Sequence, residues 1–130
     1  MTLTASDSLA ILQLVAQADA CATARDADGY AALFTEDAMM SGDQGTVGDR
    51  DALRTAVARV WSAEPPGTLH FAVNVVIDDA TPDISVRSLL LLVSPGRLSL
   101  DTADVRQIVQ KTSTGWRIRS REIHMLVSSR

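Results

Sequence analysis

The pattern of apolar and polar positions predicts helices in the first half of the chain and strands in the second. Up to about residue 61, apolar side chains recur every three or four positions, which is typical of helices with one buried face. From residue 69 onward, apolar and polar residues alternate with the period of a strand. We therefore expect an α+β domain in which one curved antiparallel sheet packs on three helices. The first helix carries the clearest apolar stripe: Ile11, Leu14, Val15, Ala18 and Ala22.

Short polar side chains mark where the helices begin. Thr4 or Ser6 can cap the first helix, Asp26 the second, and Asp49 or Asp51 the third. A short strand is expected over residues 38–41, and the glycine-rich segment 42–48 reads as a loop without the spacing of a phosphate-binding motif. In the third helix, we expect one side to be lined by Leu53, Val57, Val60 and Trp61.

One long strand is predicted from Leu69 to Asp79, after the Pro65–Gly67 turn. Strict alternation would give it one face bearing an imidazole and an amide, and one continuous apolar face. The first face would hold His70, Ala72, Asn74 and Val76, and the second Phe71, Val73, Val75 and Ile77. Such a strand could line a cavity, with His70 and Asn74 as its polar groups.

Three more strands are predicted over residues 83–94, 98–112 and 116–127. In the first of them, Ser88 is expected to point inward and Arg87 outward. In the last, alternation places Arg121 on the face opposite Trp116 and Ile118. The outward face bearing Leu89, Leu91 and Val93 is apolar, so we expect a second copy of the chain to cover it in a homodimer.

The composition argues against several classes of function but does not identify the substrate. A chain of 130 residues is one domain with room for its own core, which we take as residues 1–130. The net charge of −4 and twelve scattered basic residues argue against nucleic-acid binding. The single Cys21 excludes an internal disulfide, and with His70 and His124 it gives no zinc-ligand spacing. We therefore expect no metal and no organic cofactor, and a reducing, cytoplasmic location.

No membrane contact is expected either. The Ala-rich segment 9–24 lacks the preceding Lys or Arg of a signal peptide, and Gln13, Gln17 and Asp19 interrupt it. No apolar run reaches the length that spans a bilayer.

Several segments, in this order and spacing, resemble the SnoaL-like branch of the NTF2-like superfamily. They are Asp26 to Tyr30, Leu33 to Ala38, Gly48 to Leu53, His70-Phe71 with Asn74, Val86-Arg87-Ser88, and Gly115 to Ile118 leading to Arg121. The resemblance covers nearly the whole chain. It implies a cone formed by a curved sheet around a long N-terminal helix, a fold shared by dehydratases, isomerases, cyclases and non-catalytic binding modules.

The resemblance also implies a candidate base. In scytalone-dehydratase-like and dehydrochlorinase-like members, a histidine on the long strand works with an aspartate near the end of the first helix. The histidine matches His70, but the aspartate position, eleven residues before Phe34, holds Thr23. This departure leaves the usual dyad incomplete.

Two alternatives remain for His70. Asp19 lies one helical turn before Thr23, about 6 Å along the axis, and could supply the missing carboxylate. Otherwise, the imidazole is neutral and bonds a backbone carbonyl or the Thr23 hydroxyl. Arg121 could hold an anionic ligand group, although a salt bridge to Glu36 or Asp37 is the simpler expectation.

We therefore predict a small-molecule-binding protein with an apolar pocket for a compact polyketide-like, steroid-like or aromatic compound. If it is an enzyme, it carries out cofactor-independent dehydration, isomerisation or cyclisation, with His70 as general base and Asp19 as its partner. The alternative is a non-catalytic module resembling the small subunit of a ring-hydroxylating dioxygenase. The expected ligand-binding residues are Thr23, Tyr30, Phe34, Met40, Trp61, Asn74, Ser88 and Arg121.

Overall fold

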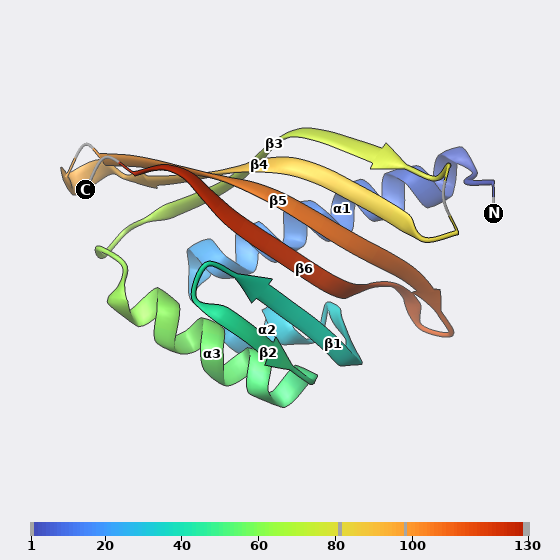
Figure 1. Ribbon diagram of the computed structural model, residues 1–130, viewed down its shortest axis with the longest axis horizontal. Helices are drawn as coiled ribbons and strands as arrows, with labels where there is room; N and C mark the ends of the chain where they lie inside the picture. The colour runs from blue at the N-terminus through green and yellow to red at the C-terminus, as the bar shows by residue number, and fades with distance from the viewer. Residues whose placement is uncertain (1, 81, 98, 129–130) are drawn as a thin grey trace.

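The computed structural model describes residues 2–80, 82–97 and 99–128. Leu98, where we expected the third long strand to begin, lies outside these residues. Figure 1 shows the helices and strands in the order that the sequence predicted, with one additional short strand, β2. The helices are α1 (Ala5–Ala24), α2 (Ala27–Ala31) and α3 (Arg50–Ala63), with a 3-10 turn at Pro95–Arg97. The strands are β1 (Phe34–Gly42), β2 (Gly45–Gly48), β3 (Leu69–Asp78), β4 (Ile84–Ser94), β5 (Ser99–Thr112) and β6 (Gly115–Ser128).

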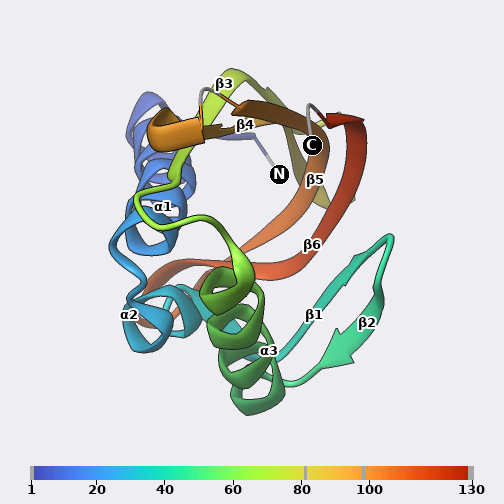
Figure 2. The ribbon, with the colours of Figure 1, turned by 90° about the vertical axis from the view of Figure 1, so that its left-hand side faces the viewer.

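The six strands form one sheet in the order β2-β1-β6-β5-β4-β3. All neighbours are antiparallel except β1 and β6, which are parallel. Seen end-on, the sheet bends from β3 at one edge to β2 at the other, and the three helices lie on its concave side (Figure 2). The predicted loop 42–48 is in part a strand, because β2 pairs with β1 across a turn at Asp43 and Gln44.

Each helix begins at one of the predicted caps. The Thr4 hydroxyl accepts from the amide of Asp7 at 3.0 Å while the Asp7 carboxylate accepts from the amide of Thr4 at 3.1 Å. Asp26 caps α2 by accepting from the amide of Gly29, and Asp49 caps α3 by accepting from the amide of Ala52. These bonds satisfy amides that the first helical turn leaves without partners.

The core lies between the helices and the concave face of the sheet. Every residue of the predicted α1 stripe is buried there, together with Phe34, Leu53, Val57 and Trp61. Val60, which we expected on the buried side of α3, is 48% exposed. None of the helices in the described residues is long and apolar enough to cross a bilayer.

A β-bulge in β3 overturns part of the predicted alternation. Val73 pairs with Leu89 but Val76 pairs with Arg87, so three steps on β3 match two on β4. Asn74 takes the extra position with a φ of 53°, a left-handed conformation that asparagine tolerates better than most residues. Asn74 and Val76 are consequently exposed, and Val75 and Ile77 pack toward the core. The prediction that Asn74 shares the inner face with His70 is therefore wrong.

A second bulge, in β6, changes the position of Arg121. Val109 pairs with Ile118, but Ile108 already pairs with Ser120, so Arg119 is the additional residue. Ile118 and Arg121 are therefore both buried, although simple alternation would place them on opposite faces. This bulge brings a guanidinium into the interior of the domain.

Candidate functional site

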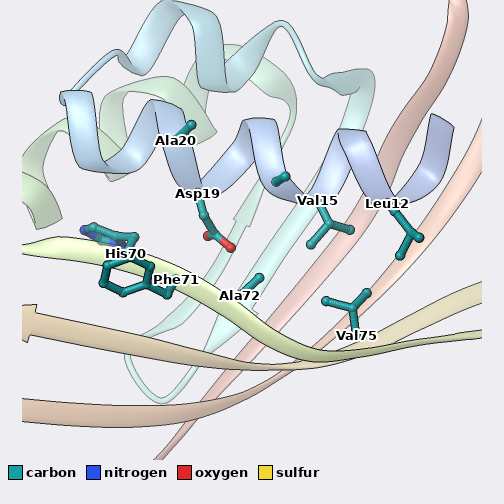
Figure 3. Close-up of a pocket in the computed structure, with 9 residues that line it drawn as sticks. Leu12, Val15, Asp19, Ala20, His70, Phe71, Ala72 and Val75 are labelled. Atoms are coloured by element: carbon teal, nitrogen blue, oxygen red, sulfur yellow. The ribbon is translucent and has the colours of Figure 1, made fainter. Parts of the chain in front are cut away.

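A cavity of about 290 Å³ lies between α1 and β3. Its wall is mainly apolar, and Asp19 and His70 supply its ionisable side chains. Figure 3 shows the Asp19 carboxylate projecting from α1 toward β3, with His70 and Phe71 on the strand beside it. The remaining wall residues are Leu12, Val15, Ala16, Ala20, Phe71, Ala72 and Val75.

His70 is held at both its backbone and its side chain. Its amide donates to Thr23 Oγ1 at 2.9 Å, which ties the start of β3 to the end of α1. Its imidazole is 5% exposed, and Nε2 lies 3.0 Å from Glu64 Oε1. Because an ionised carboxylate can only accept, this contact assigns the proton to Nε2 and leaves Nδ1 as the basic nitrogen.

Glu64 is the partner of the imidazole that sequence reasoning missed. It follows the last residue of α3 and is itself held by Arg25, whose Nη1 lies 3.3 Å from Oε1. Arg25 in turn donates to the carbonyl of Ala22 at 2.9 Å, so the end of α1 positions it. Five residues, two of them prolines, lie between Glu64 and His70, and nothing in the local pattern shows that the Glu64 side chain returns to the imidazole.

Asp19 pairs with Arg121 and not with His70, so the predicted His70–Asp19 pair is wrong. Arg121 Nη2 lies 3.2 Å from Asp19 Oδ1, and the two side chains are only 4% and 6% exposed. The simpler expectation of a bridge from Arg121 to Glu36 or Asp37 is also wrong, because Arg121 faces the interior. Glu36 is an exposed partner of Arg50 at 3.7 Å.

Aromatic side chains pack beside this ion pair. Tyr30 is buried, and the Arg121 guanidinium carbon lies 5.8 Å from its ring centroid. Its hydroxyl lies 3.9 Å from the sulfur of Met40 and its ring 5.0 Å from Phe34 and 5.1 Å from Trp61. Burial raises the pKa of the Tyr30 hydroxyl above its usual value, so Tyr30 is a neutral group here.

Four polar atoms next to the ion pair have no hydrogen-bond partner in the described part of the chain. They are Nε and Nη1 of Arg121 and both amide atoms of Gln107. Arg121 and Gln107 are cross-strand neighbours on β6 and β5, and they are 3% and 1% exposed. The sequence shows Gln107 only as one polar residue in an alternating strand, so it was not a candidate.

The other predicted pocket residues divide between interior and surface. Trp61 lies edge-on to the His70 ring at 6.4 Å, and Ser88 is buried while Arg87 is exposed, as expected. Thr23 is engaged by the His70 amide, and Asn74 is exposed on the outer side of the β3 bulge. None of the eight predicted ligand-binding residues is among those that line the cavity between α1 and β3, and their contact with a ligand stays a prediction.

A second hollow, of about 360 Å³, lies over α2 and α3. Arg54 pairs there with Asp28 and Asp51, and we do not assign this hollow a ligand. No group of three potential metal ligands occurs within residues 2–80, 82–97 and 99–128.

Comparisons with known proteins place this geometry in a wider context. The family model for the SnoaL-like domain matches residues 3–122. A search of curated proteins finds no match.

Solved structures resemble this domain over almost its whole length. A protein of unknown function with a cystatin-like fold from Nostoc punctiforme is 26% identical, with a TM-score of 0.88, and the match covers 97% of this chain and 96% of that one. An NTF2-like protein with a cystatin-like fold from Novosphingobium aromaticivorans is 20% identical, with a TM-score of 0.80 and coverage of 93% and 82%. The hexachlorocyclohexane dehydrochlorinase LinA-type3 from Novosphingobium barchaimii is 15% identical, with a TM-score of 0.82 and coverage of 95% and 89%.

Proposed function

This chain belongs to the SnoaL-like domain family, and on that premise we propose that it binds a compact, partly hydrophobic molecule in the cavity between α1 and β3, where His70 acts as a general base. The resemblance in the sequence is confirmed, and so is the expected NTF2-like cone of three helices and a curved sheet. The family contains proteins that bind small molecules and proteins that transform them. The binding of a ligand in this cavity and the reaction are the parts that we propose.

The contact between His70 and Glu64 carries the proposal. A base needs a free nitrogen of suitable basicity within reach of the substrate proton. The Glu64 carboxylate fixes the tautomer with the proton on Nε2 and stabilises the imidazolium that forms once Nδ1 has taken a proton. Glu64 therefore provides the carboxylate that orients the imidazole and stabilises the imidazolium. In the expected dyad, an aspartate at the position of Thr23 would have this role.

The cavity wall indicates the class of substrate. Apolar side chains from α1 and β3 favour a hydrophobic body of the size of an aromatic, polyketide-like or steroid-like fragment, and the polar groups lie together at Asp19 and His70. Abstraction of a proton by His70 without a cofactor leads to dehydration, isomerisation, cyclisation or elimination. One structural neighbour is a dehydrochlorinase, an enzyme of the elimination class, which is consistent with this chemistry.

A non-catalytic binding or assembly module is the second candidate, resembling the small subunit of a ring-hydroxylating dioxygenase. The observation that favours it is that neither of the two positions considered for the acidic partner of His70 provides a free carboxylate. Thr23 bonds the backbone of His70, and the Asp19 carboxylate is neutralised by Arg121.

We also propose that the protein is a homodimer that pairs through the outer face of its sheet. On that face Phe71 pairs with Leu91 and Val73 with Leu89, and Phe71 is 45% exposed. An apolar surface of this kind is usually covered. Sedimentation at micromolar concentration tests the proposal: we expect a dimer that Leu91→Asp converts to a monomer, and a monomeric wild-type protein would contradict it.

The function is tested by a ligand screen followed by turnover. A thermal-shift screen of aromatic and polyketide-like compounds identifies ligands, because binding raises the melting temperature. Each ligand is then incubated with the wild-type protein and with His70→Gln, and its conversion is followed by NMR. Conversion that is lost in His70→Gln supports the enzyme, whereas binding without conversion supports the module.

A further inference from the structure

The four unpartnered atoms of Arg121 and Gln107 are costly for the folded protein. A buried polar group without a partner costs about 1–3 kcal/mol, more when it is charged, and such groups are rare in native proteins. Here they occur together, on cross-strand neighbours that are both at least nine-tenths buried. Because the atoms belong to neighbouring side chains, one polar ligand group could satisfy several of them together.

The chemistry of the four atoms defines that group. Arg121 Nε and Nη1 can only donate, and the Gln107 amide adds one further donor nitrogen. Three donor atoms on two neighbouring side chains suit an oxygen acceptor. The remaining atom, Gln107 Oε1, can accept from a hydroxyl on the same ligand.

The acceptor should be neutral, because the charge of Arg121 is already balanced. Asp19 Oδ1 lies 3.2 Å from Nη2 of the guanidinium, and the pair is buried. A carboxylate ligand would therefore meet the negative charge of Asp19 in a region of low dielectric, where like charges repel strongly. A carbonyl oxygen takes the same hydrogen bonds without that repulsion.

We propose that Arg121 and Gln107 form a binding site for the carbonyl oxygen of a neutral, ketone-type ligand. The proposal rests on the proposed function, since the same molecule would occupy the cavity beside His70. Asp19 connects the two regions, because it lines the cavity and bonds Arg121. A carbonyl held by these donors becomes more electrophilic and makes the hydrogens beside it more acidic, which is the requirement of a base-catalysed isomerisation or elimination.

The first test measures the stability of the free protein. Replacing Gln107 with methionine keeps the length of the side chain and removes both unpartnered atoms. We expect Gln107→Met to raise the melting temperature by on the order of 3 °C, and the matched variant Gln110→Met, at an exposed position of the same strand, to leave it unchanged. A melting temperature that falls in Gln107→Met and not in Gln110→Met would show a structural partner for the amide and overturn the proposal.

The second test measures binding of three probes of similar shape: acetophenone, ethylbenzene and benzoate. We expect acetophenone to bind about tenfold more tightly than ethylbenzene, which is the contribution of a hydrogen bond from a charged donor, and more tightly than benzoate. Gln107→Met should reduce binding of acetophenone and leave that of ethylbenzene unchanged. Equal binding of acetophenone and ethylbenzene, preference for benzoate, or no binding of any probe at millimolar concentration would overturn the proposal.

The third test identifies the donor. In a protein labelled with nitrogen-15, the Nε–Hε resonance of Arg121 should shift when acetophenone is added and stay in place when ethylbenzene is added. His70→Gln should preserve this response, so a failure of the proposed catalysis and a failure of the carbonyl site give different results. A resonance that does not respond to bound acetophenone would contradict the role of Arg121.

Discussion

Asp19 of α1 and Arg121 of β6 form a buried ion pair although 102 residues separate them in the chain. The pair joins the first helix to the last strand and borders both the cavity and the unpartnered amide of Gln107. Two features place it there: the helical stripe that buries one side of α1, and the bulge that turns Arg121 inward. The stability of the domain should therefore depend on both partners together.

Removing one partner of this pair should be far more harmful than removing both. Asp19→Leu leaves a buried guanidinium without a counter-charge and should lower the free energy of unfolding by about 3–5 kcal/mol. The double variant Asp19→Leu with Arg121→Met should recover most of that loss, because no unpaired charge remains. Urea denaturation of the wild type, the two single variants and the double variant measures the coupling. Additive losses would mean that the pair is not a unit.

Replacing Glu64 should affect catalysis more than folding. In Glu64→Gln, the amide can still contact His70 Nε2, but it no longer stabilises the imidazolium, so turnover of a substrate should fall by on the order of 10²-fold. The imidazole proton on Nε2 should also lose the strongly downfield NMR shift that a bond to a carboxylate produces. Glu36→Gln, at an exposed carboxylate that pairs with Arg50, is the control and should change neither quantity. Unchanged turnover in Glu64→Gln would remove Glu64 from the mechanism.

The left-handed conformation of Asn74 should restrict which residues are tolerated at the β3 bulge. Asn74→Gly fits a φ of 53° without strain and should be nearly neutral, whereas Asn74→Val should cost about 1–3 kcal/mol. Gln110→Val, in an exposed strand position with ordinary geometry, shows the effect of valine alone. Chemical denaturation compares the three. If Asn74→Val proved as stable as Asn74→Gly, the bulge would have to relax easily.

Asp7 should contribute stability that depends on pH. Its contacts with Thr4, first through the Thr4 amide and then through the Thr4 hydroxyl, lower the pKa of the Asp7 carboxyl from 3.8 to about 2. Because the folded-state pKa lies below the unfolded value, the contribution is complete above pH 3.8 and is lost as the pH falls toward 2. Asp7→Asn should therefore be less stable than the wild type at pH 7, and the difference should shrink through this window. Thermal melts at several pH values measure it, with Asp51→Asn, an exposed first-turn acid of α3, as the control.

The fold could be predicted from the sequence because its signals are local. Thr4, Asp26 and Asp49 cap the helices as expected, and the stripe from Ile11 to Ala22 is the buried side of α1. Helical periodicity and capping depend on residues within one or two turns, so the sequence contains all that is needed. The four long strands from β3 to β6 were found for the same reason. Only residues 38–41 of β1 (Phe34–Gly42) were predicted, and β2, which consists of four residues, two of them glycine, was expected to be a loop.

The site could be predicted only in part, because bulges and long-range contacts leave weak local signals. His70 was identified, but simple alternation placed Asn74 inside and Arg121 on the face opposite Ile118, and each bulge reversed the result. Asn74 itself was the available signal, since asparagine is uncommon within strands and tolerates a positive φ. Glu64 could not have been found this way, because its approach to His70 depends on where α3 ends relative to β3.

The contacts of α1 also bear on when this protein can fold during synthesis. Trp116 Nε1 donates to Asp7 Oδ1 at 3.3 Å across 109 residues, and the helix reaches Arg121 as well. A nascent chain that has not yet extended beyond Gly115 has neither contact, and β1 lacks β6, one of its two neighbouring strands. We therefore expect this domain to stay incompletely folded until the residues of β6 have left the ribosome.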